Sequence, residues 1–322
     1  MHKMNYLVIF LVLSAVSFIY LKLADKFNII DKPNHRSSHT TPTIRGGGIL
    51  FYFGILIFFL LSGFKYPYFF IGVSFLAIIS FIDDIVTLSS SIRLPFQFLA
   101  VGLSFYEIGI IPESGLWILP FLILGVGLVN EYNFMDGING ITGFYSIVTI
   151  LAFIAINHQE NVVDQDLLIY VLMSIVIFGF YNFRKKARMF AGDIGSITLA
   201  VLLCFVGGYL IYQTMSPVLI LLVSVYSGDA ILTVIYRKSI GETLTEPHRK
   251  HIYQKLVHTL KLSHLSVSVI YSVLQLAINV VVFYTYQFST YNQLLITVTI
   301  SIALISLYIY MFKKIEKRSA SL

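Results

Sequence analysis

The stretch YFFIGVSFLAIISFIDD, residues 68–84, decides the fold, because a long apolar run ends abruptly in two aspartates. A helix needs about 20 mostly apolar residues to cross a bilayer core, and similar runs recur along the chain. The 322 residues are 57% apolar and only 12% charged, with a mean hydropathy of +0.83, whereas soluble domains carry about 25% charged residues. This composition excludes an ordinary soluble enzyme and a disordered chain, and it predicts an all-α polytopic membrane protein.

Eleven apolar segments are candidate membrane-spanning helices. No linker or internal repeat divides them, so we expect a single transmembrane domain over residues 1–322. The first segment lacks a small-residue cleavage site, which favours a membrane helix over a signal peptide. The expected spans cover residues 4–23, 48–64, 67–82, 93–110, 116–132, 140–157, 167–182, 195–213, 217–236, 264–286 and 293–312.

The positive charges predict how the chain is oriented. Eleven spans put the termini on opposite sides, and an outside N-terminus places 20 of the 22 lysines and arginines in inside segments. Only Lys3 and Lys65 then lie outside. Cytoplasmic loops carry an excess of lysine and arginine, so we expect the N-terminus outside and the C-terminus in the cytoplasm. This placement accounts for the net charge of +6 without a nucleic-acid partner.

Five polar segments interrupt the apolar pattern, and the predicted topology puts all of them on the cytoplasmic side. Ionisable groups at the ends of spans are costly unless they have a function. The segments are DKPNHRSSHTTPTIRGGGI from Asp31 to Ile49, DD at 83–84, NEYNFMDGING from Asn130 to Gly140, RKKARMFAGDIGS from Arg184 to Ser196, and GETLTEPHRKHIYQKL from Gly241 to Leu256. We therefore expect active-site loops over about 24–47, 83–93, 131–140, 183–195 and 237–263.

Carboxylate and amide oxygens in two of these segments indicate a divalent cation. Asp83 and Asp84 suit a cation, a lipid-phosphate nucleophile or both, although two adjacent acids also occur as an ordinary polar helix end. Asn130, Asn133 and Asp136 recur every three residues and would share one helix face. Mg²⁺ accepts such oxygens, usually with phosphate oxygens completing its octahedron.

The remaining segments combine acidic, aromatic and cationic groups. Glycines bracket Asp193 at the start of a span, and Phe190 before it suits stacking on a base. The guanidinium of Arg45 suits phosphate oxygens, and the glycines Gly46–Gly48 permit close backbone approach to a ligand. A basic loop that contacts lipid headgroups is the simpler interpretation of this first segment.

Two histidines in the last segment have two interpretations. His248 and His251 suit a metal pair, but a zinc site needs three or four protein ligands, so a phosphate or sugar clamp with Arg249 fits better. An interfacial basic helix is the interpretation without a ligand. Asp229 lies in the middle of a span, where an acid should be paired or line a cavity.

Taken together, in this order and on one side, the motifs resemble the polyprenyl-phosphate N-acetylhexosamine-1-phosphate transferases, glycosyltransferase family 4. The resemblance runs from Asp31 to about Lys255. DDIVTL at 83–88 and HRKHIYQ at 248–254 are similar to the branch that initiates O-antigen and lipopolysaccharide side chains, rather than to the muramoyl-pentapeptide branch. The DGxDG motif of bacterial members reads DGING here, with Asn139 at the second acid.

The resemblance implies an enzyme of the bacterial cytoplasmic membrane with its active site on the cytoplasmic face. Such an enzyme transfers an N-acetylamino-sugar 1-phosphate from a UDP-sugar to undecaprenyl or another polyprenyl phosphate and releases UMP. It uses Mg²⁺, with Mn²⁺ as an alternative, and starts a cell-surface polysaccharide. A muramoyl-pentapeptide-type transferase is the alternative within the family, and a homodimer is left open.

The motif match implies catalytic roles for aspartates and binding roles for amide, aromatic and basic side chains. The catalytic set is Asp83, Asp84, Asp136 and Asp193, and the substrate-binding set is Arg45, Asn130, Asn133, Asn139, Phe190, His248, Arg249 and His251. The implied roles are Mg²⁺ ligation by Asp193 and Asn133, positioning or deprotonation of the lipid phosphate by Asp83, and uracil binding by Phe190 and Asn139.

Two other classes of protein remain as alternatives. A membrane transporter would carry its polar site near the midplane, whereas all the polar motifs except Asp229 lie at one interface. A scaffold protein would not need carboxylates, amides and histidines concentrated on one face. The sequence therefore favours the enzyme.

Overall fold

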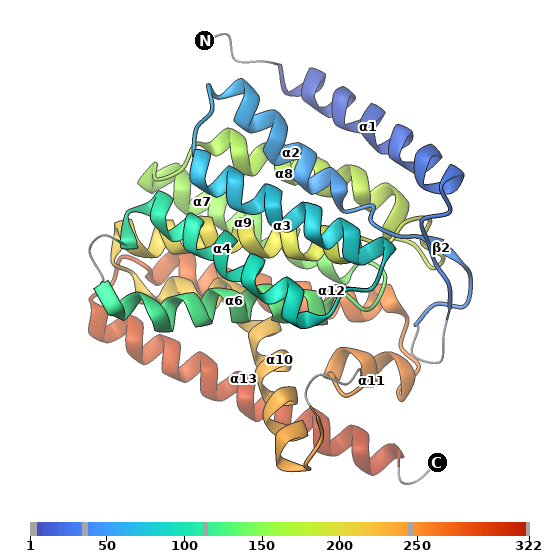
Figure 1. Cartoon of the computed structure of the whole chain (residues 1–322). Helices are drawn as coiled ribbons and strands as arrows, with labels where there is room; N and C mark the ends of the chain where they lie inside the picture. Colours follow the sequence, from blue (N-terminus) through green and yellow to red (C-terminus); the bar gives the residue numbers. More distant parts are fainter. Residues whose placement is uncertain (1–4, 34–37, 112–114, 244–247, 320–322) are drawn as a thin grey trace.

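The computed structural model describes residues 5–33, 38–111, 115–243 and 248–319, and almost all of them are helical (Figure 1). The helices are α1 Tyr6–Lys26, α2 Ile49–Leu61, α3 Pro67–Ile85, α4 Ser90–Ile108, η1 Gly115–Trp117, α6 Ile118–Met135, α7 Ile141–Glu160, α8 Gln165–Asn182, α9 Gly192–Thr214, η2 Pro217–Val223, α10 Ser224–Ser239, α11 Ile252–His258, α12 His264–Thr285 and α13 Thr290–Ser319. Parts of two expected loops, residues 34–37 and 244–247, lie outside the described residues.

The helices confirm the expected all-α membrane fold. Each of the eleven expected spans falls on a helical stretch of the described chain, with η2 and α10 running on as one stretch. Nine stretches within the described residues are long and apolar enough to cross a membrane. The exceptions are α2, which has only 13 residues, and α4, whose first turns carry Arg93 and Gln97. The number of crossings and the orientation stay predictions.

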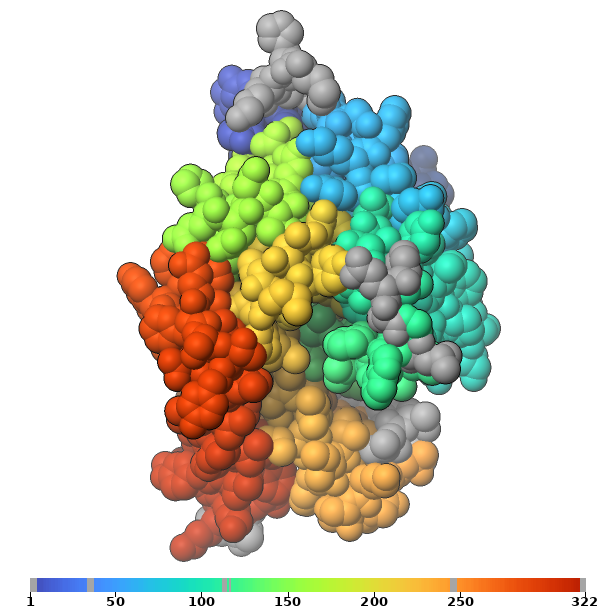
Figure 2. Space-filling model, turned by 90° about the vertical axis from the view of Figure 1, so that its left-hand side faces the viewer, coloured from blue at the N-terminus to red at the C-terminus, as the bar shows by residue number. Residues whose placement is uncertain are grey.

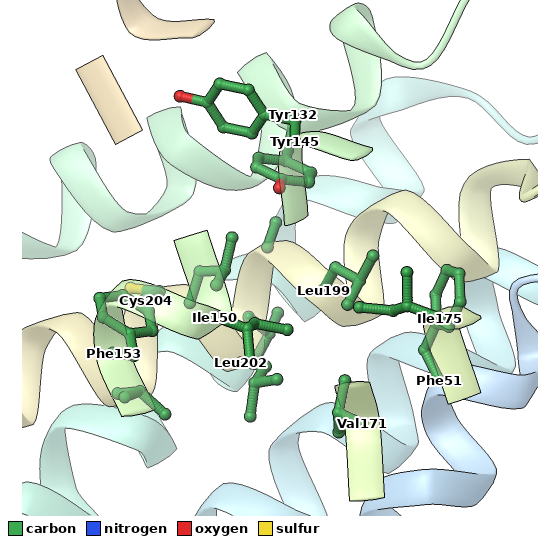
Figure 3. Close-up of a cluster of buried hydrophobic side chains, with 14 of the residues drawn as sticks. Phe51, Tyr132, Tyr145, Ile150, Phe153, Val171, Ile175, Leu199, Leu202 and Cys204 are labelled. Carbon is green, nitrogen blue, oxygen red and sulfur yellow. The ribbon is translucent and has the colours of Figure 1, made fainter. Parts of the chain in front are cut away.

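α9 lies at the centre of the bundle, and 78% of its most apolar 18-residue window is buried. It packs against α2, α3, α4, α6 and α7, because it is apolar all round and has no polar face to expose. Figure 3 shows its side chains among those of neighbouring helices: Leu199, Leu202 and Cys204 with Phe51, Ile150, Phe153, Val171 and Ile175. This packing fixes the position of the first turn of α9.

The segments that carry the polar motifs meet at one end of the bundle, on the right in Figure 1. Strand β1 (Ile30–Asp31) pairs antiparallel with β2 (Thr43–Ile44), a pairing that the sequence did not predict. The carbonyl of Ile44 accepts a hydrogen bond from Phe190 N at 2.8 Å. Loops that are far apart in sequence therefore form one surface.

At the opposite end of the bundle, the connections that the structure describes in full are short. Figure 2 looks onto this end, where α7 and α8 are joined by residues 161–164 and α12 and α13 by residues 286–289. The polar loops on one side and the tight turns on the other agree with the asymmetry expected from the sequence.

The glycines at 46–48 approach the protein's own chain. Gly47 N donates to Phe190 O at 2.8 Å and Gly48 N to Ala191 O at 2.9 Å. A Cβ on Gly48 would clash with the backbone of Gly195. The first loop can therefore pack directly onto the start of α9, which is a different use of these glycines from the expected approach to a ligand.

Candidate active site

Three carboxylates and two guanidinium groups form an ion-pair network at the polar end of the bundle. Arg45 Nε lies 2.7 Å from Asp84 Oδ1, and Arg45 Nη2 lies 3.1 Å from Asp193 Oδ1. Arg93 Nη1 lies 2.8 Å from Asp83 Oδ2 and 3.0 Å from Asp193 Oδ2. Both arginines thus bind Asp193, and the network contains one more carboxylate than guanidinium groups.

Exposure separates the roles of the three carboxylates. The side chain of Asp84 is fully buried, that of Asp83 is 5% exposed and that of Asp193 is 15% exposed. Asp84 accepts hydrogen bonds from Asp193 N at 2.8 Å and Ile194 N at 3.1 Å. It therefore caps α9 from another helix, since the residue before α9 contributes no side-chain cap. Asp193 and Asp83 are left as the acids that a ligand can meet.

This cap requires glycine at position 192. Gly192 has a φ of +72°, which costs an L-residue about 1–2 kcal/mol, and a Cβ there would clash with the Asp84 carboxylate. We expect Gly192→Ala to lower the unfolding temperature in detergent by several degrees and to reduce activity.

Gly127→Ala is the matched control, because no atom lies within 4 Å of its added Cβ. Alanine is favoured over glycine within a helix by about 1 kcal/mol, so this variant should be as stable as the wild type or more so. Equal stabilities for the two variants would contradict the role assigned to Gly192.

The structure brings the two expected Mg²⁺ ligands together. The side chains of Asp83 and Asn133 both lie close to the carboxylate of Asp193. Two neighbouring carboxylates repel each other unless a proton or a cation lies between them, and here the guanidinium of Arg93 binds both. No group of three or more His, Cys, Asp or Glu suited to a metal occurs among the described residues. This donor set fits Mg²⁺, which is usually held by one or two carboxylates plus substrate phosphates.

Asp136 lies at the turn after α6, close to this cluster in sequence. Its carboxylate accepts a hydrogen bond from Thr142 Oγ1 at 2.6 Å. Burial raises the pKa of Asp136 to about 6, and the bond from Thr142 opposes this rise. A carboxyl group with a pKa of about 6 thus stands directly after α6, the helix that carries Asn133.

Asn130 faces α4 instead of the carboxylates. Its amide pairs reciprocally with that of Gln97, with distances of 2.8 and 3.2 Å. The pair lines a cavity of about 160 Å³ together with Arg93 and two serines, Ser90 and Ser91. Asn130 therefore belongs to the wall of a polar hollow beside the network.

Arg93 is the functional residue that the sequence interpretation missed. It joins Asp83 to Asp193, it lines the cavity, and its Nε is buried with no hydrogen-bond partner among the described residues. A guanidinium with a spare donor next to a polar cavity suits an anion. One signal was available: Arg93 is the sole lysine or arginine between Lys65 and Arg184.

The expected base-binding residues lie on neighbouring loops. The amide nitrogen of Asn139 donates to the carbonyls of Arg184 at 2.9 Å and Lys185 at 3.2 Å. This fixes the amide orientation and leaves Asn139 Oδ1 buried with no partner in the described part of the chain. The ring of Phe190 is covered edge-on by His39, with ring centroids 4.8 Å apart. His39 was not among the expected residues.

The histidines of the last segment make no hydrogen bond or ion pair with the carboxylate network among the described residues. His251 is only 2% exposed, and its ring lies 4.9 Å from that of His248. Burial, together with the nearby His251 and Arg237, lowers the pKa of His248 to about 4, so this ring is neutral at pH 7. Arg249 precedes His251 by two residues on the same segment.

Fold and site together define a polytopic membrane enzyme that gathers acids, arginines and amides at one end of a helical bundle. The family model for glycosyl transferase family 4 matches residues 66–211, a region that contains Asp83, Arg93, Asn133 and Asp193. The chain is 26% identical over 291 residues to a probable undecaprenyl-phosphate N-acetylglucosaminyl 1-phosphate transferase of Bacillus subtilis strain 168, covering 83% of this chain and 80% of that protein.

Two further relatives support this match. An undecaprenyl-phosphate alpha-N-acetylglucosaminyl 1-phosphate transferase of Yersinia pestis is 25% identical over 283 residues, covering 77% of this chain and 75% of the relative. A phospho-N-acetylmuramoyl-pentapeptide-transferase of Streptococcus equi subsp. equi strain 4047 is 28% identical over 211 residues, covering 59% and 63%. These matches are to glycosyl transferase family 4 and to polyprenyl-phosphate N-acetylglucosaminyl 1-phosphate transferases, the family that the motifs of this chain resemble.

Proposed function

We propose that this protein transfers an N-acetylamino-sugar 1-phosphate from a UDP-sugar to polyprenyl phosphate, at the cytoplasmic face of the bacterial inner membrane. The observation that carries the proposal is the network in which Arg45 and Arg93 both bind Asp193. The names of the relatives from Bacillus subtilis and Yersinia pestis support a lipid phosphate acceptor and an N-acetylglucosaminyl 1-phosphate group. The product would be a polyprenyl-pyrophosphoryl sugar that starts a cell-surface polysaccharide.

The reaction is a phosphoryl transfer in which atoms and charges balance. An oxygen of the lipid phosphate attacks the β-phosphorus of the donor, the bond from that phosphorus to the bridging oxygen breaks, and UMP leaves with this oxygen. The second pKa of a phosphate monoester is about 6, so the acceptor is largely a dianion at pH 7. The remaining task is to position two anions and offset their charge.

The chain's own residues divide this task. Arg93 stands between Asp83 and the polar cavity, where it offers donors to the lipid phosphate. Asp83 positions that phosphate or takes its remaining proton. Arg45 reaches Asp193 from the first loop and faces the donor side. Arginine side chains that are fixed in advance favour the charge that develops during transfer.

We also propose that Mg²⁺ is the cofactor. Asp193 and Asn133 would hold it, with Asp83 adjacent. When bound, the ion offsets the charge of the phosphate oxygens that approach each other. Because the protein supplies few ligands, phosphate oxygens of the substrates would supply the others.

The test uses the purified full chain in detergent with polyprenyl phosphate, Mg²⁺ and a panel of UDP-sugars that includes UDP-N-acetylmuramoyl-pentapeptide. We expect UMP to appear only when both the lipid and the metal are present, and EDTA to abolish the release. The preferred donor in the panel identifies the sugar.

Other nucleotide products would overturn the proposal in different ways. Release of UDP would mean that the glycosidic bond to the sugar is broken, as in an ordinary glycosyl transfer. UMP release that survives EDTA would remove the Mg²⁺ assignment and leave the transfer reaction in place. No nucleotide release from any donor would favour the transporter.

A further inference from the structure

Asp229 of α10 binds five donors although it lies inside an apolar span. The residue is 4% exposed. Its Oδ1 accepts from Ile252 N at 3.0 Å, Thr233 Oγ1 at 3.1 Å and His251 Nδ1 at 3.3 Å, and its Oδ2 accepts from Tyr271 Oη at 2.6 Å and Tyr253 N at 3.3 Å. A buried carboxylate with this many donors is held in the charged form.

Two of these donors are the first backbone N–H groups of α11. The residue before this helix, His251, makes no side-chain cap of its own. Asp229 therefore caps α11 from α10; in Figure 1, α10 lies at the lower centre of the bundle and α11 to its right. The position of His251 relative to α10 is set by this contact.

The same carboxylate also sets the orientation of the His251 ring. An ionised carboxylate only accepts hydrogen bonds, so Nδ1 of His251 must carry the proton in this pair. The other ring nitrogen, Nε2, has no hydrogen-bond partner among the described residues. When one nitrogen of a histidine is bound by a carboxylate, the other is the one presented to a ligand.

α11 also contacts the end of α6, the helix that carries Asn133, the amide of the proposed metal site. Tyr253 Oη donates to Phe134 O at 3.0 Å, and the phenol group lies so close to Gly137 that a Cβ there would clash with it. The segment that contains His251 and residues 133–137 at the end of α6 are therefore packed together, and Asp229 of α10 binds this unit.

We propose that Asp229 is a positioning residue that fixes His251 with its proton on Nδ1, so that Nε2 binds the sugar phosphate of the donor. This inference rests on the proposed function, because the donor defines what Nε2 meets. If Asp229 only capped α11, the position of the proton on the His251 ring would have no effect on donor binding.

Two substitutions of His251 separate its ring nitrogens. The amide of His251→Asn reaches the position of Nδ1 and keeps the contact with Asp229, whereas that of His251→Gln reaches the position of Nε2. We expect His251→Gln to keep several times more kcat/KM for the UDP-sugar than His251→Asn. The reverse order would overturn the proposal, and it would do so whether or not an Asp229 variant folds.

Asp229→Asn tests the positioning directly. We expect kcat/KM for the UDP-sugar to fall by about 10- to 100-fold, as for other residues that orient a functional histidine, with the KM for polyprenyl phosphate unchanged. The double variant with His251→Ala should lose no more than His251→Ala alone, because both changes remove one interaction. If the losses in kcat/KM of the two single variants multiply in the double variant, Asp229 acts only as a helix cap.

Thr233→Val is the matched control, since it removes another hydrogen bond to Asp229 Oδ1 without touching His251. It should keep kcat/KM within about twofold of the wild type. A comparable loss in this variant would show that any change around Asp229 disturbs the site.

A histidine ¹⁵N NMR spectrum gives a readout that does not depend on turnover. We expect one ring signal of the Nδ1–H tautomer that disappears in His251→Asn, changes in Asp229→Asn and is unaltered in Thr233→Val. Absence of that signal in the wild type would overturn the positioning role even if UMP is released. If the signal is present but no UMP forms, the proposed function fails and the fixed tautomer stands.

Discussion

Replacing Asp193 by asparagine is expected to abolish UMP release, with a loss in kcat of about 10³-fold or more, equivalent to about 4 kcal/mol in the activation barrier. Asp193 is the acid on which Arg45 and Arg93 converge, and it is the expected metal ligand together with Asn133. An amide keeps the shape and some hydrogen bonds but removes the negative charge, and it leaves two guanidinium groups with less charge to bind.

The measurement is single-turnover UMP release at saturating lipid and donor, with the unfolding temperature in detergent recorded in parallel. Asp164→Asn is the matched control, because Asp164 also binds a cation, Lys65 at 2.7 Å, but at the opposite end of the bundle. Asparagine caps helices as well as aspartate does, so this control should retain both activity and stability. An Asp193→Asn protein with more than about a tenth of wild-type turnover would remove the metal assignment.

Replacing Arg93 by alanine should have the second-largest effect, a loss of about 10²- to 10³-fold in kcat/KM for polyprenyl phosphate, as when a fixed donor is removed from a charged transition state. The guanidinium contacts Asp83 and Asp193 at once and keeps a spare donor beside the cavity. Alanine would leave the two carboxylates in contact with less positive charge between them. We expect the KM for the UDP-sugar to change much less.

Arg93→Lys distinguishes charge from geometry. A lysine keeps the positive charge but cannot bind two carboxylates and an anion in one plane, so we expect recovery to within about tenfold of the wild type. Lys65→Ala controls for loss of a cation at the other end of the bundle. If Arg93→Ala raised only the KM for the UDP-sugar, Arg93 would belong to the donor side.

The sequence was sufficient for the helical framework, because membrane spans are local patterns of apolar residues that do not depend on contacts elsewhere. The gathering of the polar motifs at one end followed from the same alternation of spans. The β1–β2 pair could not be predicted, since two-residue strands have no period to detect and form here through contacts of the first loop.

Individual roles in the site depended on contacts between distant segments. Asp83 and Asp84 are neighbours in sequence, yet Asp83 is partly open to the site, whereas Asp84 caps α9. The packing of α3 on α9 decides which aspartate takes which role. Asn130 continues the three-residue spacing of Asn133, but its amide is bound by Gln97 of another helix. The sequence predicted that Asp229 needs a partner, but it did not identify His251 as that partner.

The burial of α9 has a consequence for inhibitors of this enzyme. Asp193 belongs to the first turn of a helix enclosed by five others, and its backbone is capped by Asp84. A compound that binds this carboxylate meets a preorganised partner, so little affinity is lost in ordering it.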